Sequence, residues 1–380
     1  MEVLIEEEPL FTPDETSTTH FFDEIPPERK MLLTSDEIDI PLGVVGILSG
    51  QGGVGKSMMA LNLAIATASQ CPIDAFESAE PMRVLYLSGE DDKDEMHRRT
   101  RSILIKHFRR DIDMGYEYDL DHINSILNFV HIPDLTGKPL RLTEKGHDII
   151  ETQVFRQLML ALEPFDQLGL IVIDTAIRFR GGSENDSSDT SLFISLCERL
   201  AKKTGATVLV VTHTNKQAAG QNNQNTIRGS SALVDNARLV LSMRQMTDKE
   251  ADQNEVSSPE NYVCLQCVKS NYTKLGKSMW FKKGDLGQLE FTDLQSKMLE
   301  KIVFDQEKDK QTILEKIEDE SEQNKFYSIS NFSKIFGGKD GVLELSTQRI
   351  TRLLKEMIKS EQINVKTEGK KKNMHINHGI

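Results

Sequence analysis

The chain has 380 residues, of which 38% are hydrophobic and 28% are charged. It is longer than one compact domain usually requires, and no apolar run is long enough to cross a bilayer. The acidic N-terminus lacks the basic and apolar regions of a secretory signal, so we expect a cytoplasmic protein with no membrane partner.

Residues 1–38 are acidic, contain four prolines and show no sustained periodicity, which predicts a flexible N-terminal arm. The net charge is −13, but the first 40 residues carry −10 and the other 340 carry only −3. The low pI therefore does not exclude nucleic-acid binding by the rest of the chain. The arm is either a solvated tail or a segment that mimics nucleic acid or docks on a neighbouring subunit.

Apolar strands alternate with amphipathic helices across residues 39–292. This alternation predicts an α/β domain with a mostly parallel sheet and helices on both faces. The expected strands are Val44–Leu48, Val84–Leu87, Phe129–Ile132, Leu168–Asp174 and Thr207–Thr212. The expected helices are Lys56–Ser69, Glu95–Arg109, His147–Leu162 and Thr190–Thr204.

Short strands follow one another closely after Arg228, and this rhythm predicts an antiparallel extension at one edge of the sheet. They are Arg238–Met243, Tyr262–Val268, Ser278–Phe281 and Leu286–Phe291. Cys264 and Cys267 have the spacing of half a zinc site. No second pair accompanies them, so a core-strand role is favoured for both cysteines.

Residues 293–310 are polar and charged and are predicted to be a linker. Residues 311–380 predict a second, small domain, with Ser346 able to cap its last helix. Its expected elements are helices at Gln311–Glu320, Ser328–Phe336 and Ser346–Ser360, and a hairpin of Ile363–Val365 and Met374–Ile376. Three helices followed by a basic hairpin are typical of a winged-helix domain.

A phosphate-binding pattern lies between the first predicted strand and the first predicted helix. Glycines in such a loop let backbone N–H groups approach phosphate oxygens, and the helix N-terminus adds partial positive charge. Lys56 is expected to reach the β- and γ-phosphates of ATP, and Ser57 is expected to bind Mg²⁺. The predicted nucleotide contacts of this segment are Gly50, Gln51, Gly52, Gly53, Val54, Gly55, Lys56, Ser57 and Met58.

Two further strands end in acidic residues. Asp174 ends a buried strand and is predicted to be the second magnesium ligand. Threonine follows Asp174, so the base that activates water is expected from Glu90, the first of three acids after another strand. The alternative is that these acids cap the next helix, a role that we assign to Asp91 and Asp92.

Thr212 and His213 end a third buried strand. Either side chain could touch the γ-phosphate and report its loss to the following loop. A structural hydrogen-bonding role for His213 is the alternative.

These motifs together resemble the RecA- and DnaB-type ATPases, and most of all the RepA-like hexameric replicative helicases of plasmids and phages. The resemblance covers about residues 40–290, and it implies a RecA-like P-loop NTPase core in a ring of identical subunits. It rests on Gly50–Ser57, Ser88–Asp91, Ile171–Asp174, Val211–His213, Arg228–Arg238 and Val268–Tyr272. In such rings ATP binds at subunit boundaries, and a cation from the neighbour completes the site. The motif positions indicate Arg238 or Lys269 for this cation, with surface or strand-edge salt bridging as the alternative.

The resemblance also implies DNA contacts on loops that face the channel of the ring. Residues 215–228 are polar and bracketed by Lys216 and Arg228, which suits strand tracking without sequence preference. Arg178 and Arg180 lie in a second candidate loop, for which a flexible surface loop is the alternative.

The C-terminal region predicts a further DNA-binding surface, made of a basic helix and a basic wing that would contact duplex DNA. A solvated helix and a disordered tail are the alternative. The candidate residues are Arg349, Arg352, Lys355, Lys359, Lys370, Lys371 and Lys372.

Three functions fit these motifs. The first is an ATP-driven helicase or translocase that forms a ring on DNA. The second is an ATP-switched regulator or loader that assembles on duplex DNA without unwinding it. The third is a binder that holds nucleotide without hydrolysis, against which the residues Lys56, Ser57, Asp174 and Glu90 argue. The motifs favour the first function but do not separate it sharply from the second.

Overall fold

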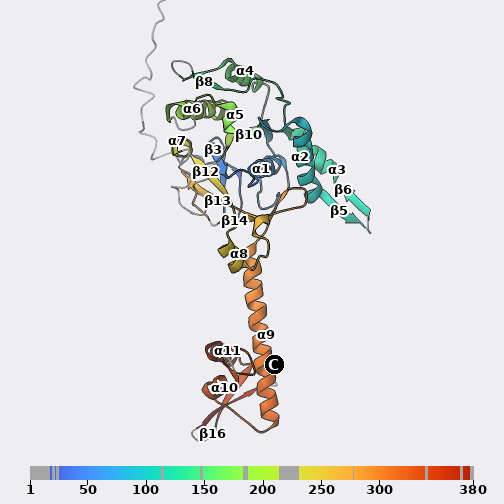
Figure 1. The fold of residues 1–380 in the computed structure, drawn as a ribbon, viewed down its shortest axis with the longest axis vertical. Helices are drawn as coiled ribbons and strands as arrows, with labels where there is room; N and C mark the ends of the chain where they lie inside the picture. Colours follow the sequence, from blue (N-terminus) through green and yellow to red (C-terminus); the bar gives the residue numbers. More distant parts are fainter. Residues whose placement is uncertain are drawn as a thin grey trace, which may run out of the picture. The chain divides into compact units, whose positions relative to one another are not determined.

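The computed structural model describes residues 18, 22, 25–112, 115–145, 149–182, 187–213, 231–276, 278–338, 341–368 and 371–376. Contacts divide the chain into two compact units, Met1–Thr292 and Asp293–Ile380. Figure 1 shows the large sheet of the first unit and the helices α9–α11 of the second.

A nine-stranded sheet organises the first unit, in the order β15–β14–β13–β12–β3–β11–β10–β4–β7. The strands from β12 to β7 run parallel, and β13, β14 and β15 extend the sheet antiparallel. Their bounds are β3 Val45–Gly50, β4 Arg83–Ser88, β7 Val130–His131, β10 Leu168–Asp174, β11 Thr207–His213, β12 Leu239–Gln245, β13 Tyr262–Ser270, β14 Met279–Lys283 and β15 Leu289–Phe291. The predicted α/β fold with a mostly parallel sheet is confirmed.

Strand β12 belongs to the parallel part of the sheet, so its prediction as antiparallel was wrong. It pairs in parallel with β3, with Leu239 opposite Gly46 and Met243 opposite Gly50. The antiparallel edge begins one strand later, where β13 pairs with β12. The spacing of short strands could not show that β12 is parallel. β12 lies on the other side of β3 from β11, and this order depends on how the chain connects the two strands.

Helices cover both faces of the sheet, and side chains of the central strands alternate between two apolar cores. Val172 packs into the core that contains α1, whereas Ile171 and Ile173 pack into the core that contains α6. Burial on both faces explains why these strands are continuous apolar runs. The helices of Figure 1 around this part of the sheet are α1 Lys56–Ala68, α2 Lys93–Phe108, α3 Leu120–Phe129, α4 Gln153–Ala161, α5 Ala176–Phe179 and α6 Ser187–Thr204.

Two small hairpins appear that the sequence did not predict. β5 Arg109–Ile112 pairs with β6 Gly115–Tyr118, and β8 Thr143–Lys145 pairs with β9 Ile149–Glu151. The second hairpin occupies the start of the helix predicted at residues 147–162, so α4 begins only at Gln153. Local periodicity missed this start, because β9 has only three residues and is too short to show an alternating pattern. The remaining helices of this unit are α7 Ser231–Asn236, α8 Asp248–Asn254 and a 3-10 helix at Pro259–Asn261.

The end of the acidic N-terminal region is part of the core, so the prediction of a flexible arm was wrong for residues 31–38. β1 Met31–Leu33 pairs antiparallel with β2 Ile40–Pro41, and Leu33 and Ile38 are fully buried. The guanidinium of Arg29 lies over the ring of Tyr272, 3.8 Å from its centroid. The rest of the predicted arm, before residue 25, lies outside the described residues except for 18 and 22.

The second unit packs three helices and a hairpin around an apolar core. Its elements are α9 Leu294–Glu322, α10 Ile329–Phe336, α11 Thr347–Lys359, β16 Ile363–Glu368 and β17 Lys371–Ile376. Ser346 caps α11 as predicted, because its hydroxyl accepts a hydrogen bond from the N–H of Arg349 at 3.2 Å. Helix α9 begins at Leu294, not Gln311, so the residues predicted as a linker are helical.

Candidate functional site

The candidate site lies at the carboxyl edge of the parallel strands. In the register of the sheet His213 stands opposite Gly50, and Asp174 stands opposite Ser88. Four parallel strands therefore end side by side, and the polar residues at their ends are brought to one edge. Ligands of open parallel sheets bind at this edge.

The phosphate loop connects β3 to α1 with a backbone that its glycines permit. A Cβ on Gly50 would lie 2.6 Å from the carbonyl oxygen of Met243, and Gly55 has a φ of 104°. No side chain caps the first turn of α1, and no acidic residue lies in that turn. The N–H groups at the helix start are therefore left for an anion. Val54 and Met58 point into the core, so they can offer only backbone groups.

Lys56 lies at the centre of the site and is only 5% exposed. Its Nζ donates to the carbonyl oxygen of Gln51 at 2.8 Å and lies 3.2 Å from Nδ1 of His213. Burial lowers the pKa of Lys56, and the carboxylates of Asp174 and Glu90 partly oppose this by favouring the charged ammonium. The structure places the ring of His213 beside this lysine.

Asp174 is 4% exposed, and its two carboxylate oxygens differ in their hydrogen bonding. Its Oδ2 accepts a hydrogen bond of 2.6 Å from the hydroxyl of Tyr86, whereas its buried Oδ1 has no hydrogen-bond partner among the described residues. Burial raises the pKa of Asp174, and the nearby hydroxyls of Tyr86 and Ser57 oppose this rise. An open carboxylate oxygen near a serine hydroxyl is the kind of oxygen set that a hard divalent cation takes.

Tyr86 is a site residue that sequence reasoning missed. It lies in β4, directly opposite Val172 of β10, and is fully buried. Burial and the neighbouring carboxylate of Asp174 raise the pKa of Tyr86 well above its usual value, so the phenol stays a hydrogen-bond donor. Only the pairing of β4 with β10 brings the two side chains together. A tyrosine in a strand otherwise made of aliphatic residues was the one available signal.

Replacing Tyr86 by Phe should lower the free energy of unfolding by about 1–3 kcal/mol, because a buried carboxylate oxygen then loses its donor. Urea unfolding checks this. Tyr262→Phe is the matched control, since the Tyr262 hydroxyl forms no hydrogen bond to the described residues and its loss should change little. Equal unfolding midpoints for Tyr86→Phe and the wild type would contradict the assigned role.

Glu90 lies beside Asp174 because Gly89 lets two segments approach closely. A Cβ on Gly89 would lie 2.8 Å from Cβ of Arg178, and the N–H of Gly89 donates to the carbonyl oxygen of Asp174 at 2.6 Å. Oε1 of Glu90 accepts a hydrogen bond of 3.1 Å from the Thr175 hydroxyl and lies 4.0 Å from Nε of Arg178.

The other two acids of this strand end have different partners. Asp92 caps α2 by accepting from the N–H of Glu95 at 2.8 Å, as predicted. The Asp91 carboxylate forms an ion pair with Arg99 at 2.5 Å, although burial is the main influence on its pKa and raises it. Glu90 is therefore not used for capping.

The two candidate cations of the neighbouring subunit lie far from the phosphate loop of their own chain. The N–H of Arg238 donates to the carbonyl oxygen of Val45, at the opposite end of β3 from Gly50. Five residues of strand separate these levels by roughly 17 Å. Lys269 lies at the same edge, and its Nζ donates to the carbonyl oxygen of Asp235 at 2.8 Å. Neither cation is placed to act on its own phosphate loop.

The predicted DNA contacts of the first unit differ in their exposure to solvent. Arg178 is exposed, but Arg180 is only 5% exposed and is not presented to a ligand in this structure. Lys216 and Arg228 lie outside the described residues.

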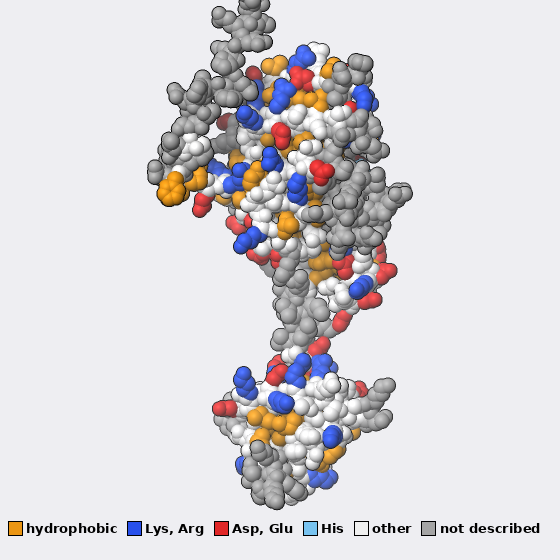
Figure 2. Space-filling model, turned by 90° about the vertical axis from the view of Figure 1, so that its left-hand side faces the viewer, with side chains coloured by type: hydrophobic (Ala, Val, Ile, Leu, Met, Phe, Trp, Pro, Cys, Tyr) orange, Lys and Arg blue, Asp and Glu red, His pale blue; other side chains and the backbone are white. Residues whose placement is uncertain are grey.

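In the second unit, helix α11 presents most of the predicted basic residues. Arg352, Lys355 and Lys359 are exposed, whereas Arg349 forms an ion pair with Asp309 of α9. Arg352 also lies 3.8 Å from Glu356. Figure 2 shows Lys and Arg side chains over one face of this unit, around a small apolar patch. Lys370 and the side chains of Lys371 and Lys372 lie outside the described part of the chain.

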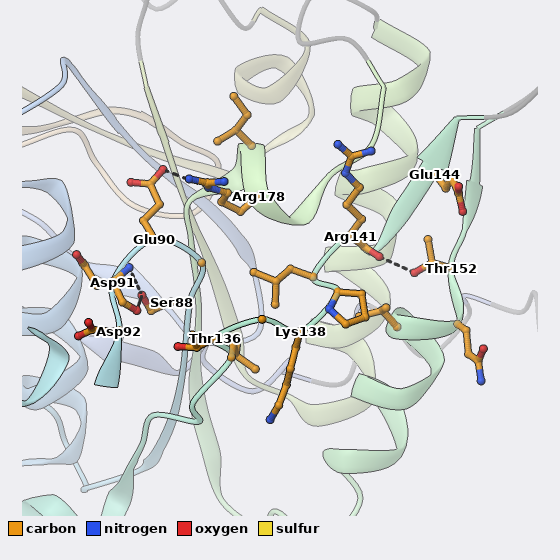
Figure 3. A pocket seen from close by; sticks show the side chains of 18 residues that line it. Ser88, Glu90, Asp91, Asp92, Thr136, Lys138, Arg141, Glu144, Thr152 and Arg178 are labelled. Carbon is orange, nitrogen blue, oxygen red and sulfur yellow. Dashed lines mark hydrogen bonds and ion pairs between the residues drawn. The ribbon is translucent and has the colours of Figure 1, made fainter. Parts of the chain in front are cut away.

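A pocket of about 820 Å³ beside Glu90 is a second feature that sequence reasoning missed. Figure 3 shows Arg178, Arg141 and Lys138 among the side chains that line it. No motif marks residues 135–141, 144 and 152–154, which form one wall. Folding alone brings them to the strand end that carries Glu90.

The sheet order and the phosphate loop define an α/β core of the RecA-like P-loop ATPase class, as the motif resemblance predicted. The lysine, serine and aspartate of such a core form a nucleotide-binding site.

Comparison with protein families gives the same answer. Residues 6–219 match a family described as an AAA domain, and this range is more than half of the chain. The chain therefore belongs to the AAA domain family.

Solved structures with a similar fold have low sequence identity to this chain. One of them, an ATPase domain, is 14% identical, with 66% of this chain and 85% of that chain covered and a TM-score of 0.45. A DnaB-like replicative helicase is 13% identical over 66% of this chain and 59% of its own, with a TM-score of 0.46. The RadB recombinase is 12% identical over 66% and 92%, with a TM-score of 0.41.

The described residues offer neither a membrane span nor a metal-binding cluster. None of their helices is both long and apolar enough to span a bilayer. They also contain no cluster of three or more His, Cys, Asp or Glu side chains arranged to hold a metal ion. Cys264 and Cys267 are buried free thiols of β13, which agrees with the core-strand interpretation.

Proposed function

We propose that this protein is a Mg²⁺-dependent ATPase that acts on DNA as a ring-forming helicase or translocase. The observation that carries the proposal is the meeting of Lys56, Asp174 and Glu90 at one sheet edge. Lys56 begins α1 after the phosphate loop, Glu90 follows β4, and Asp174 ends β10. Both carboxylates favour the charged form of the lysine. A lysine, a metal-binding acid and a second acid are the parts that ATP hydrolysis requires.

The residues present fit a magnesium ion. Ser57 Oγ and the open Oδ1 of Asp174 would hold it, with Tyr86 keeping the other oxygen of Asp174 in place. The chemistry that Mg²⁺ supplies when bound is neutralisation of the phosphate charge.

Backbone groups and side chains of this chain carry out phosphate binding and proton transfer. Backbone N–H groups of the loop and the Lys56 ammonium bind the β- and γ-phosphates. Glu90 accepts a proton from water as the water oxygen bonds to the γ-phosphorus and the bond to the β-phosphate oxygen breaks, which releases ADP and phosphate. His213, beside Lys56, lies where the γ-phosphate would be sensed.

A ring completes this site in the proposal. Arg238 and Lys269 lie at the sheet edge away from the phosphate loop, so each can serve only the nucleotide of a neighbouring subunit. A cation that arrives from a neighbour stabilises the charge that develops on the transferred phosphate. Arg238 is the stronger candidate, because the Lys269 ammonium is already bound to a carbonyl of its own chain.

DNA is the proposed partner of both units. In the second unit Arg352, Lys355 and Lys359 follow one another along the exposed side of α11, as a helix that contacts phosphates or a groove requires. We propose a winged-helix role for α10, α11 and the hairpin. This basic surface also favours the second candidate function, an ATP-switched regulator or loader that assembles on duplex DNA.

The proposal predicts that single-stranded DNA raises the steady-state rate of ATP hydrolysis and that DNA affinity falls steeply with salt. Each phosphate contact adds about 0.7 to the slope of log affinity against log salt for a single strand. Phosphate release with and without oligo-dT, and anisotropy titrations of labelled oligo-dT, measure both quantities. Hydrolysis that does not respond to any DNA would exclude the motor.

The same titration with duplex DNA separates the two candidate functions. A variant with Arg352, Lys355 and Lys359 changed to Ala should lose duplex binding and keep the response to oligo-dT if the protein is a motor. In a regulator the duplex governs the ATPase, and the same variant should lose that response. A variant with Lys308, Lys310 and Lys325 changed to Ala removes as much charge from the same unit and is the control.

A further inference from the structure

Two side chains contact the carboxylate of Glu90 and occupy one of its oxygens. The Thr175 hydroxyl donates to Oε1 at 3.1 Å, and Nε of Arg178 lies 4.0 Å from the same oxygen. Both residues follow Asp174 closely along the chain. A base that is hydrogen-bonded in this way is less available to a water molecule, so the segment after Asp174 controls the availability of Glu90.

The two holding contacts differ in strength and in exposure. Thr175 is buried, whereas the Arg178 and Glu90 side chains are 58% and 43% exposed. A charge-assisted contact is usually about 2.7–2.9 Å long, so an exposed pair at 4.0 Å is weak. A phosphate oxygen near Arg178 can therefore replace Glu90 as its partner.

The pocket beside this pair offers further cations. Lys138 and Arg141 line it together with Arg178, and neither Lys138 nor Arg141 forms an ion pair with a described carboxylate. In Figure 3 the guanidinium groups of Arg141 and Arg178 lie on the same side of the pocket. A chain of phosphates can thus meet more than one cation here.

Acidic side chains on the facing wall are mostly neutralised. Asp91 is paired with Arg99, Asp92 caps α2, and Glu90 is paired with Arg178 itself. Only Glu144 lacks such a partner among the described residues that line the pocket. Asp91 and Asp92 therefore repel a phosphate less strongly than carboxylates without partners would.

Five apolar residues also line the pocket, among polar ones such as Thr136, Thr152 and Gln153, and they suit the faces of bases. These five are Leu135, Pro139, Leu140, Val154 and Ile177. The volume, about 820 Å³, lies in the range of about 300–1,000 Å³ that holds small ligands. A short stretch of one nucleic-acid strand fits this space, and a duplex does not.

We propose that this pocket binds a segment of single-stranded DNA and that binding releases Glu90 for catalysis. Phosphodiester groups contact Arg178, Arg141 and Lys138, and the move of Arg178 to a phosphate frees one side of the Glu90 carboxylate. The strand prefers the state in which Arg178 has left Glu90, and that difference in affinity shifts the protein toward the active state. The inference rests on the proposed action on DNA and names the site that couples DNA to hydrolysis.

Three variants test the coupling, by ATPase assays with and without oligo-dT and by oligo-dT anisotropy at several salt concentrations. Arg141→Ala should weaken oligo-dT binding about tenfold and lower the salt slope by about 0.7. Arg178→Ala should raise the DNA-free rate toward the stimulated rate of the wild type and bring the stimulation ratio near one. Thr175→Val should raise the DNA-free rate without a change in oligo-dT affinity, because it loosens Glu90 without touching the pocket.

Two controls separate coupling from loss of structure. Arg178→Lys keeps the charge and should restore much of the stimulation. Arg156→Ala removes an exposed arginine of the nearby helix α4 that does not line the pocket, and it should behave like the wild type.

The outcomes distinguish this inference from the function on which it rests. If oligo-dT does not change the ATPase rate of the wild type, both the proposed function and this inference are wrong. The second outcome is a wild type that responds to oligo-dT while Arg178→Ala and Arg141→Ala keep its stimulation ratio and salt slope. It would rule out the pocket as the DNA site and would still support a DNA-dependent ATPase.

Discussion

Replacing Glu90 by Gln should lower the rate of ATP hydrolysis by about 10²–10⁴-fold and leave ATP binding nearly unchanged. The amide has almost the same shape and still accepts the hydrogen bond from Thr175, but it cannot take a proton from water. The loss should therefore appear in kcat, with little change in the affinity for a fluorescent ATP analogue. Steady-state phosphate release and equilibrium nucleotide titration measure the two quantities.

Asp92→Asn is the matched control for this change. It converts a carboxylate to an amide two residues away, and asparagine caps a helix as well as aspartate does. The Asp92 variant should hydrolyse ATP at the wild-type rate. Normal hydrolysis by Glu90→Gln would show that another group activates the water, and the assignment of the base would then be wrong.

Lys56→Ala should reduce hydrolysis by at least about 10²–10³-fold and should also weaken ATP binding. The ammonium is 5% exposed and balances two carboxylates, so its removal leaves the phosphates of ATP facing Asp174 and Glu90 without the cation between them. Both kcat and nucleotide affinity should fall, unlike the result for Glu90→Gln. The assays are the same phosphate-release and nucleotide-binding measurements.

Lys106→Ala controls for the loss of a well-packed lysine. Lys106 forms an ion pair of 2.5 Å with the buried Asp74 in the same unit and has no part in the proposed phosphate site. This variant should be less stable to urea but should hydrolyse ATP normally at a temperature where it is folded. If Lys56→Ala instead kept more than about a tenth of the wild-type rate, the loop would not bind phosphate in the proposed way.

The phosphate loop could be identified before folding because its chemistry is local. Backbone N–H groups, glycine conformations and the start of the following helix all come from one continuous segment, Gly50–Ser57. The structure places this segment between β3 and α1, as predicted. The strands next to it could also be predicted, since burial on both faces makes them continuous apolar runs.

Features that depend on strand pairing or on contacts between distant segments were missed or misplaced. β12 was assigned to the antiparallel edge because strand order follows from the crossover connections, not from spacing. The start of α4 was placed too early because the β8–β9 hairpin competes for the same residues. The segment Met31–Ile38 looked flexible from its charge, yet Leu32, Leu33 and Ile38 are buried in the core.

The sequence by itself determined that the chain has a P-loop, an apolar strand ending in Asp174 and an acidic strand end at Glu90. Each of these features is formed by a few consecutive residues. Only the tertiary structure decided that Tyr86 donates to Asp174, that Arg178 and Thr175 contact Glu90, and that residues 135–141 and 152–154 line a pocket beside it. These relations join segments that are distant along the chain, and strand register and close packing at Gly89 set them.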